Sequence, residues 1–380
     1  MPIIRRFMDY NSTAPLSPFV REKIIESLDL FGNPSSIHYE GRLARKELFN
    51  ARQRIASLID LPVQNIYFTS GASEAAASLL QPCYMLGKSP IFMSHLYVGA
   101  TEHPAILNGG SFPSQAVSVI RVNDQGIIDK EFLEEKLITH DQSQGQPLVA
   151  IQAANNETGV LQPLEELAIL VRKYHGVLVV DAAQAMGKIE ISFSEKIGDF
   201  FIGSGHKIGA LKGVGFFAAP HMLLAPKTLI SAGGQEKGLR GGTEALLPII
   251  SFGWAAEEKK RSLKEEFIYI KSLQEKLEAF LCNAPKNIKI YGAQVNRLPN
   301  TTLFSIEGVK AETMQIDLDL QGFSVSSGAA CSSGKIGPNK VLLAMGGDSE
   351  LGALRISLGS KTKEEDIDAL CAALKKWTHL

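Results

Sequence analysis

Residues able to do nucleophilic or acid–base chemistry follow short apolar runs of the sequence. Lys207 comes three residues after DFFIGS, Asp181 follows VLVV, and Cys331 stands inside SSGAACSSG. A lysine beside a buried strand loses solvation, so its pKa falls and its amine becomes able to form an imine. Taken alone, Lys207 is better explained as a surface lysine whose charged end reaches water.

An acid at the end of a buried strand needs a partner, because an unpaired buried carboxylate is costly. The protonated pyridine nitrogen of pyridoxal phosphate (PLP) is such a partner for Asp181, although an N-cap of a helix is the commoner role for such a residue. Residues 71–74, GASE, precede a helix-forming stretch. They predict either a phosphate site at a helix N-terminus or an ordinary capped turn.

Two further polar segments also follow apolar runs. Residues 155–159, NNETG, offer an amide that can bind a phenolic oxygen, or they only form a turn. His103, in TEH, and His206, next to Lys207, are either contacts of a cofactor or packed structural histidines.

The cysteines predict a reducing compartment and one reactive thiol. The four cysteines are far apart and form no CxxC, so we expect neither a disulfide framework nor a zinc site. Unpaired cysteines are typical of a reducing compartment, and we therefore expect a cytoplasmic protein. The small residues around Cys331 predict an accessible thiol, which is a liability unless it reacts. Cys83, Cys282 and Cys371 lie among apolar residues and are expected to be buried.

The composition excludes some classes of partner. Among 380 residues, 39 are Lys or Arg and 40 are Asp or Glu, a net charge of -1, which gives no field for binding nucleic acid or an anionic membrane. No secretory signal and no apolar run of about 20 residues is present, so no membrane span is expected. No GxGxxG follows the first strand-like run, which sets aside a nicotinamide dehydrogenase.

The periodicity predicts an α/β protein. Helices are expected from Ser17–Pro18 to near Gly32 and over 40–59; from Ile66 on, apolar runs alternate with helical stretches, as in a mostly parallel sheet covered on both faces. A charged helix over about 255–281 precedes mixed strands and a closing helix from Glu364 to Trp377. We therefore expect a large domain over 15–255 and a smaller α+β domain formed by 1–14 and 256–380.

The order and spacing of these motifs resemble one family over nearly the whole chain. The sequence is similar to the group I cysteine desulfurases (NifS/IscS-like) of the class V aminotransferase family, which are fold-type I PLP enzymes. The motifs that carry the resemblance are DYNSTAP (9–15), GNPSSIH (32–38), FTSGASE (68–74), TEH (101–103), NNETG (155–159), VDAAQ (180–184), SGHK (204–207), RGGT (240–243), SSGAACSSG (326–334) and LRISLG (354–359).

The resemblance implies a role for each matching residue. Lys207 would carry PLP as a Schiff base, Asp181 would bind the pyridine nitrogen, and His103 would stack on the ring. Asn156 and Gln184 would contact its phenolic oxygen side. The residues expected at the cofactor phosphate are Ala72, Ser73, Ser204, His206 and, from the neighbouring subunit of a homodimer, Thr243.

The implied substrate is L-cysteine, which would become L-alanine. Asn156 and Arg355 would bind it, since a planar guanidinium suits a carboxylate. Lys207, Cys331 and His103 would be catalytic, and Cys331 would receive the sulfur as a persulfide for acceptors such as iron–sulfur cluster assembly. Departures from the family pattern are Ser73, Ala75-Ala76, the segment IGALKG after Lys207, and a tail that stops at Leu380.

Three alternatives stay open at this point. A selenocysteine lyase or another class V enzyme, such as an aminotransferase, would share the scaffold, although an aminotransferase needs no thiol like Cys331. A diverged homologue would bind PLP or a partner protein with little turnover. The sequence leaves open the sulfur acceptor and whether an iron–sulfur scaffold protein docks on the short tail.

Overall fold

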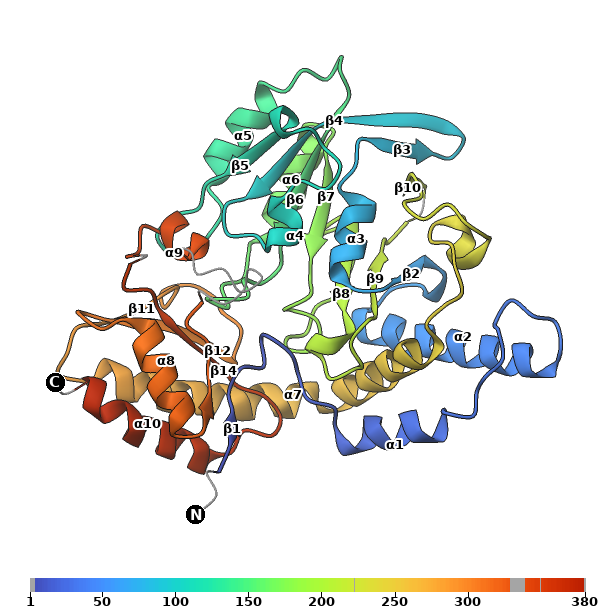
Figure 1. Ribbon diagram of the computed structural model, residues 1–380. Helices are drawn as coiled ribbons and strands as arrows, with labels where there is room; N and C mark the ends of the chain where they lie inside the picture. Colours follow the sequence, from blue (N-terminus) through green and yellow to red (C-terminus); the bar gives the residue numbers. More distant parts are fainter. Residues whose placement is uncertain (1–3, 222, 329–338, 349, 379–380) are drawn as a thin grey trace.

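The computed structural model describes residues 4–221, 223–328, 339–348 and 350–378, whose strands form three sheets (Figure 1). The strands are β1 (Arg6–Phe7), β2 (Ile66–Thr69), β3 (Cys83–Leu86), β4 (Ser89–Gly99), β5 (Val117–Ile120), β6 (Gln146–Gln152), β7 (Val177–Asp181), β8 (Phe200–Ser204), β9 (Gly215–Ala218), β10 (Leu224–Pro226), β11 (Ile288–Ile290), β12 (Thr301–Ile306), β13 (Phe323–Ser324) and β14 (Leu354–Ser357). The α-helices are α1 (Pro18–Glu26), α2 (Tyr39–Ile59), α3 (Ala72–Leu79), α4 (Pro104–Leu107), α5 (Lys130–Ile138), α6 (Leu164–Lys173), α7 (Leu246–Cys282), α8 (Ala311–Leu320), α9 (Lys340–Ala344) and α10 (Glu364–Thr378).

The largest sheet has a parallel centre and antiparallel edges. Its order is β10-β3-β4-β6-β7-β8-β9-β2, and β5 also pairs with β4. The pairs β5–β4, β4–β6, β6–β7 and β7–β8 are parallel, as expected for the fold class. Because β9 runs antiparallel to both β8 and β2, the strands β2 and β8 point the same way. The carboxyl ends of β2, β6, β7 and β8 therefore meet at one edge of this sheet.

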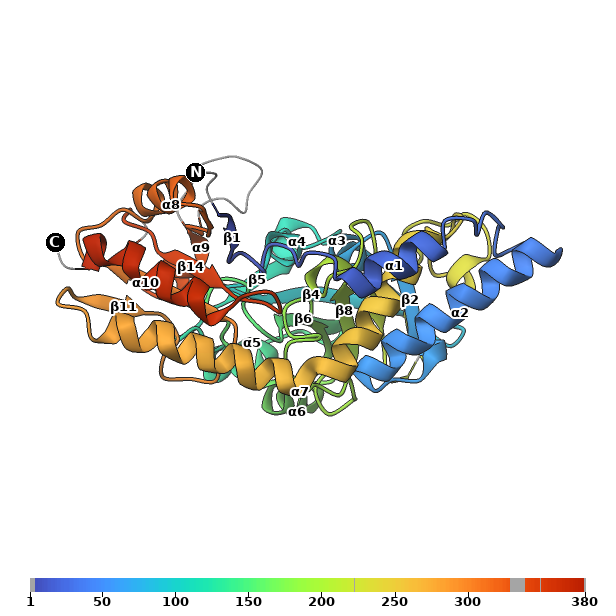
Figure 2. The ribbon, with the colours of Figure 1, turned by 90° about the horizontal axis from the view of Figure 1, so that it is seen from below.

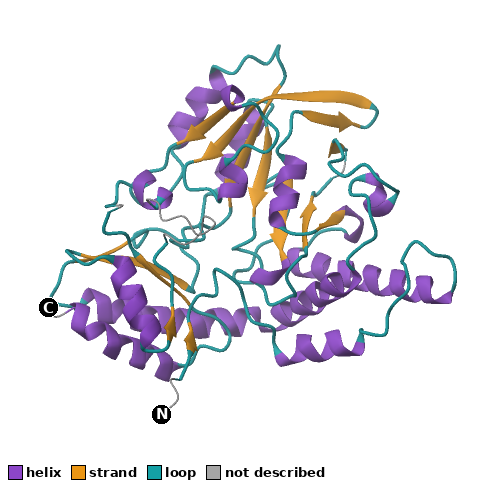
Figure 3. Cartoon of the chain, viewed as in Figure 1, coloured by secondary structure: helices purple, strands orange, loops and turns teal. Residues whose placement is uncertain are grey.

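The apolar runs that predicted this sheet are buried on both of its faces. Along β7, Val177 and Val179 belong to one hydrophobic cluster, whereas Leu178 and Val180 belong to another. This alternation is what a strand covered on both sides requires. Figure 3 shows helices on both sides of the sheet strands. The short hairpin of β3 and β4 extends one edge and was not predicted.

Two predicted helix boundaries were wrong. The first helix begins at Pro18, with the Ser17 hydroxyl accepting from the Val20 N–H at 3.0 Å, but it ends at Glu26 rather than near Gly32. The Ser27 hydroxyl donates to the Lys23 carbonyl at 2.8 Å, and a turn follows. Helix α7 begins at Leu246, not near residue 255, because its first part is apolar and the prediction followed charged residues.

A second unit surrounds a small antiparallel sheet. β12 pairs with β11 and β14, and α8 and α10 lie beside these strands (Figures 1 and 2). The N-terminal β1 pairs in parallel with β13. Helix α7 runs the length of the molecule in both views. Its residues up to Ala256 pack in the core of the large sheet, and those from Ile270 pack in the core of the small one.

We propose the domain division at 15–255 and 1–14 with 256–380 on this basis; the boundary falls inside α7. Within the described ranges, no helix is both long enough and apolar enough to cross a membrane.

Candidate active site

A pocket of about 650 Å³ lies where the carboxyl ends of the parallel strands meet. Ligands of open α/β sheets bind at this edge. Most of the residues singled out from the sequence line it: Ala72, Ser73, His103, Asn156, Asp181, Gln184, Ser204, His206, Lys207 and Arg355. The described structure thus brings together residues that are up to 283 positions apart, from Ala72 to Arg355.

The N-terminus of α3 forms one wall of the pocket. Helix α3 begins at Ala72 with Gly71 as its N-cap, and no side chain caps its first turn. A Cβ added at Gly71 would meet no protein atom within 4 Å, so this wall is open. Uncapped N–H groups and the helix dipole suit a phosphate, as expected for Ala72 and Ser73. Ala75 and Ala76, two departures from the family pattern, are buried against the sheet.

Asp181 ends β7 at the pocket wall. Its carboxylate accepts the N–H of Ala183 at 2.9 Å, and no helix begins there, so it is not the N-cap of a helix. Burial raises the pKa of Asp181, while the nearby His103 and Lys207 act in the opposite direction. A cationic partner such as a protonated pyridine nitrogen would offset the cost of burying the Asp181 carboxylate. The residues at this point therefore fit PLP.

His103 lies across from Asp181 and caps α4. Its Nδ1 accepts the N–H of Ala105 at 3.1 Å, which places the hydrogen of the neutral ring on Nε2. The ring keeps an exposed surface, yet the protein around it desolvates the charged form and lowers the pKa of His103. A neutral imidazole facing the pocket is suited to stacking on an aromatic ring.

Lys207 reaches from the turn after β8 to the N-terminal segment. Its Nζ donates to the carbonyl oxygens of Asn11 at 2.6 Å and Ser12 at 2.9 Å. The next residue back, His206, contacts the Thr13 hydroxyl at 3.2 Å through Nδ1. Burial lowers the pKa of His206 to about 4, with contributions from the charges of Lys207 and Lys212. The N-terminal segment is therefore a wall of the site.

Arg355 enters the pocket from β14 with a nearly buried side chain, 2% exposed. It donates to the Glu157 carboxylate at 2.8 Å, to the Asp9 carboxylate at 2.7 Å and to the Asn156 carbonyl at 3.1 Å. The guanidinium expected to bind a substrate carboxylate is thus also part of a buried ion-pair network. Asn156 itself donates its amide N–H to Glu157 at 2.7 Å.

Three residues of the site were not singled out from the sequence. Asn11 joins Lys207 to Gln184, whose Nε2 donates to the Asn11 carbonyl at 2.9 Å. The Lys188 amine contacts the side-chain amide oxygens of both Asn11 and Gln184. Glu102 is buried behind His103: its Oε1 accepts the Gln152 N–H at 3.0 Å, its Oε2 has no hydrogen-bond partner among the described residues, and burial raises its pKa well above the usual value.

Two predicted site residues are not placed in the pocket. Thr243 is exposed and does not line it, and Cys331 lies outside the described residues. The expectation that the other cysteines are buried was wrong. Cys83 and Cys282 are exposed and Cys371 is half-buried. Cys83 begins β3, a strand with one buried residue, and Cys282 ends α7. Exposure alone therefore does not distinguish Cys331.

Comparisons with known proteins place this geometry in a family. The sequence profile of the family "Aminotransferase class-V" matches residues 6–370. Cysteine desulfurase IscS of Clostridium botulinum (strain Kyoto / Type A2) is 32% identical, covering 97% of this chain and 93% of the relative. Cysteine desulfurase IscS 1 of Archaeoglobus fulgidus is 34% identical, covering 97% and 95%.

The structural comparison agrees with the sequence comparison. A NifS-like protein from Rickettsia africae ESF-5 has a TM-score of 0.87 at 34% identity and is matched over 99% of both chains. A structure described as SspA in complex with cysteine has a TM-score of 0.76 at 25% identity over 93% of this chain and 99% of that one. The chain belongs to the class V aminotransferase family of PLP enzymes and is related to the cysteine desulfurases.

Proposed function

We propose that the protein is a cysteine desulfurase, which converts L-cysteine to L-alanine and takes the sulfur onto Cys331 as a persulfide. One observation carries the proposal: Lys207, Asp181, His103 and Arg355 line a single pocket whose walls fit PLP. PLP, when bound, supplies an electron sink for a negative charge at the Cα of an amino acid. Both relatives described above are named as cysteine desulfurases.

The residues of the pocket would divide the work as follows. Asp181 would keep the pyridine nitrogen protonated, and His103 would pack on the ring. Ala72, Ser73, Ser204 and His206 would bind the phosphate, and Asn156 and Gln184 would bind the phenolic oxygen side. Arg355 and Asn156 would hold the carboxylate of the substrate.

Lys207 would move the proton that the reaction requires. Its amine lies 2.6 Å from the Asn11 carbonyl oxygen, which restricts where Nζ can lie. Nζ, released from the cofactor, would remove the hydrogen on the Cα of L-cysteine. The same group can later return a proton to the carbon skeleton.

Cys331 would take the sulfur. Its thiolate would attack the sulfur atom of L-cysteine, an S–S bond would form and the substrate Cβ–S bond would break with its electron pair left on carbon. Protonation of that carbon gives the methyl group of alanine, so one cysteine and one thiol yield one alanine and one persulfide. The persulfide would pass to a downstream acceptor, such as iron–sulfur cluster assembly, in a reducing cytoplasm.

The proposal also includes a homodimer. Thr243 is exposed on the surface and away from the pocket of its own chain, as a residue would be that serves the phosphate of a neighbouring subunit. Oligomers of this kind have closed twofold symmetry, so two equivalent sites would form.

A thiol-specific experiment tests the proposal. After brief exposure of the PLP-loaded protein to L-cysteine, peptide mass spectrometry should find one added sulfur on the peptide that contains Cys331. Cys331→Ser should bind L-cysteine but accumulate no persulfide and release no alanine. The matched control is Cys282→Ser, because Cys282 is an exposed thiol that does not line the candidate active site. Alanine production by Cys331→Ser at the wild-type rate would reject Cys331 as the sulfur acceptor.

A further inference from the structure

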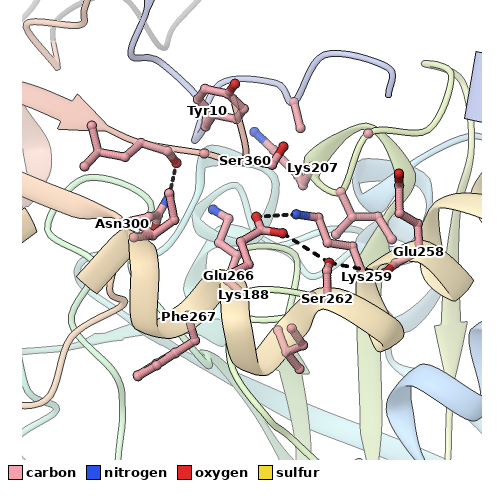
Figure 4. A pocket seen from close by; sticks show the side chains of 18 of the residues that line it. Tyr10, Lys188, Lys207, Glu258, Lys259, Ser262, Glu266, Phe267, Asn300 and Ser360 are labelled. Atoms are coloured by element: carbon pink, nitrogen blue, oxygen red, sulfur yellow. Dashed lines mark hydrogen bonds and ion pairs between the residues drawn. The ribbon is translucent and has the colours of Figure 1, made fainter. Parts of the chain in front are cut away.

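A second pocket, the α7 pocket, shares Lys207 with the candidate active site. It has a volume of about 220 Å³, and its lining includes Lys188, Lys207, Lys259, Glu266 and Asn300. Figure 4 shows Lys188 in this pocket beside Glu266, which bonds Lys259 and Ser262 along α7. Lys207 is a lining residue of both pockets. The α7 pocket is therefore separated from the active site by few side chains.

Lys188 is a side chain of the α7 pocket that contacts both Gln184 and Asn11 of the active site. Its Nζ donates to the Gln184 side-chain oxygen at 2.5 Å and to the Asn11 side-chain oxygen at 2.8 Å. Gln184 in turn donates to the Asn11 carbonyl at 2.9 Å. The three residues form a hydrogen-bonded ring that closes through the Asn11 main-chain carbonyl, and the same carbonyl accepts from Lys207.

The chemistry of an amine decides which way both amides point. Lys188 donates to the Gln184 oxygen, so the amide oxygen faces Lys188 and the NH₂ group faces the Asn11 carbonyl. One hydrogen of that NH₂ group goes to the Asn11 carbonyl, and the other is left for the proposed contact with the cofactor. Without Lys188, the Gln184 oxygen loses this donor, and only the bond of the NH₂ group to the Asn11 carbonyl still fixes the amide.

The same argument applies to Asn11. Its side-chain oxygen accepts from Lys188 and from Asn300, the latter at 3.1 Å. Its NH₂ group must then face the Asn156 carbonyl at 3.0 Å. This fixes the segment whose main-chain oxygen holds Lys207. Lys188 thereby contributes one hydrogen bond to the orientation of each amide and, through Asn11, to the position of the Lys207 amine.

The environment of Lys188 is unfavourable for an amine, which indicates that its hydrogen bonds have a role in the site. The side chain is largely surrounded by protein, and this burial lowers its pKa well below the usual value. The positive charges of Lys207, Arg355 and Lys259 act in the same direction, and only Glu266 opposes them. An amine kept among three cations is costly, and it is not needed to fill space, since a methionine would fill the same volume.

We propose that Lys188 is a positioning residue of the active site, which orients the amide of Gln184 toward the cofactor and, through Asn11, holds the Lys207 amine in place. This inference rests on the proposed function, because it gives Gln184 and Lys207 the roles stated there. It predicts an effect on cofactor binding itself, before any turnover of cysteine.

Three variants test the inference. Lys188→Met keeps the side-chain volume and removes the amine, so the fold should be retained, as circular dichroism and thermal unfolding would show. The control is Lys259→Met, because Lys259 lines the same pocket and pairs with Glu266 without contacting Gln184 or Asn11. Lys188→Ala opens space beside the α7 pocket for a small added amine.

The first readouts are the dissociation constant of PLP, measured by titration of the apoprotein, and the pH midpoint of the visible absorbance of the bound cofactor. Lys188→Met should bind PLP about tenfold more weakly, as expected when an oriented hydrogen bond is lost, and should shift that midpoint. Lys259→Met should match the wild type. A Lys188→Met protein with wild-type affinity and pH midpoint would overturn the inference.

Rescue by an added amine separates positioning from general damage. Ethylammonium should restore PLP affinity to Lys188→Ala in a concentration-dependent manner, and should not restore it to Lys188→Met, whose side chain fills the space. Equal effects on both variants would contradict the inference. Because these readouts require no cysteine turnover, a protein that makes no alanine but loses PLP affinity in Lys188→Met would refute the proposed function and leave this inference standing.

Discussion

Arg355 of β14 and Glu157, which follows β6, form a buried ion pair with a distance of 2.8 Å between Nη1 and Oε1. Their side chains are 2% and 4% exposed. The second guanidinium nitrogen pairs with Asp9 at 2.7 Å. Arg355 therefore links the large sheet, the small sheet and the N-terminal segment, in addition to its proposed contact with the substrate.

Arg355→Ala should affect both stability and substrate binding. Removing one partner of a buried pair takes the guanidinium charge away from Glu157 and should lower the free energy of unfolding by about 3–5 kcal/mol. The loss of a charged hydrogen bond should weaken L-cysteine binding by roughly 1.5–3 kcal/mol. Urea unfolding and a spectroscopic titration with L-cysteine measure the two effects.

The control for Arg355 is Arg297→Ala. Arg297 forms a buried pair with Glu278, at 2.8 Å, and does not line the candidate active site. The Arg297→Ala protein should have a lower free energy of unfolding and an unchanged affinity for L-cysteine. If Arg355→Ala also keeps that affinity, Arg355 is not a substrate ligand.

Lys207→Ala should remove the visible absorbance that PLP acquires when it is bound to the protein through an amine. The reason is that Lys207 is proposed to form that bond. Lys212→Ala is a matched control, because Lys212 is a second lysine that lines the same pocket, and its spectrum should be that of the wild type. An unchanged spectrum in Lys207→Ala would assign the bond to another amine.

The low pKa of His206 should make the folded protein less stable in mild acid. Its pKa is about 4 in the folded protein, against about 6.5 for an unperturbed histidine. Between these values the unfolded state binds more protons, so the free energy of unfolding decreases as the pH falls from 6.5 toward 4.

The decrease in unfolding free energy from pH 7 to pH 5 should be about 2 kcal/mol smaller in His206→Asn than in the wild type. Urea unfolding at both pH values measures it. His221→Asn, which changes an exposed histidine, should behave as the wild type. Equal pH dependence of the wild type and His206→Asn would refute the low pKa of His206.

If Thr243 serves the neighbouring subunit, two inactive variants should restore activity when they form a mixed dimer. Thr243→Ala should bind PLP more weakly, and mixed dimers of Thr243→Ala with Lys207→Ala should contain one complete site. Random mixing makes half of the dimers mixed, so about a quarter of the wild-type alanine production should return. No recovery after verified subunit exchange would show that Thr243 does not act across the interface.

The sequence predicted the parts of the site that depend on strand ends. Asp181 and Lys207 follow buried apolar strands, and a parallel sheet must bring such positions to one edge. The cysteines show the limit of local patterns, because Cys282 has apolar neighbours in the sequence but lies exposed at the end of α7.

Long-range contacts could not be predicted in this way. Asn11 and Gln184 are 173 positions apart, and the turn containing Lys188 has no periodicity that would indicate which residue its amine contacts. Only the folded chain shows that the N-terminal segment forms a wall of the pocket.

Alanine formation from L-cysteine by the purified, PLP-loaded protein, with a reductant present to discharge the persulfide, tests the central proposal most directly. The account predicts alanine and sulfide in equal amounts, from the wild type and not from Cys331→Ser. A PLP-loaded protein that forms no alanine from L-cysteine would contradict the proposal and would indicate another amino-acid substrate, such as selenocysteine, or a homologue that binds PLP without turnover.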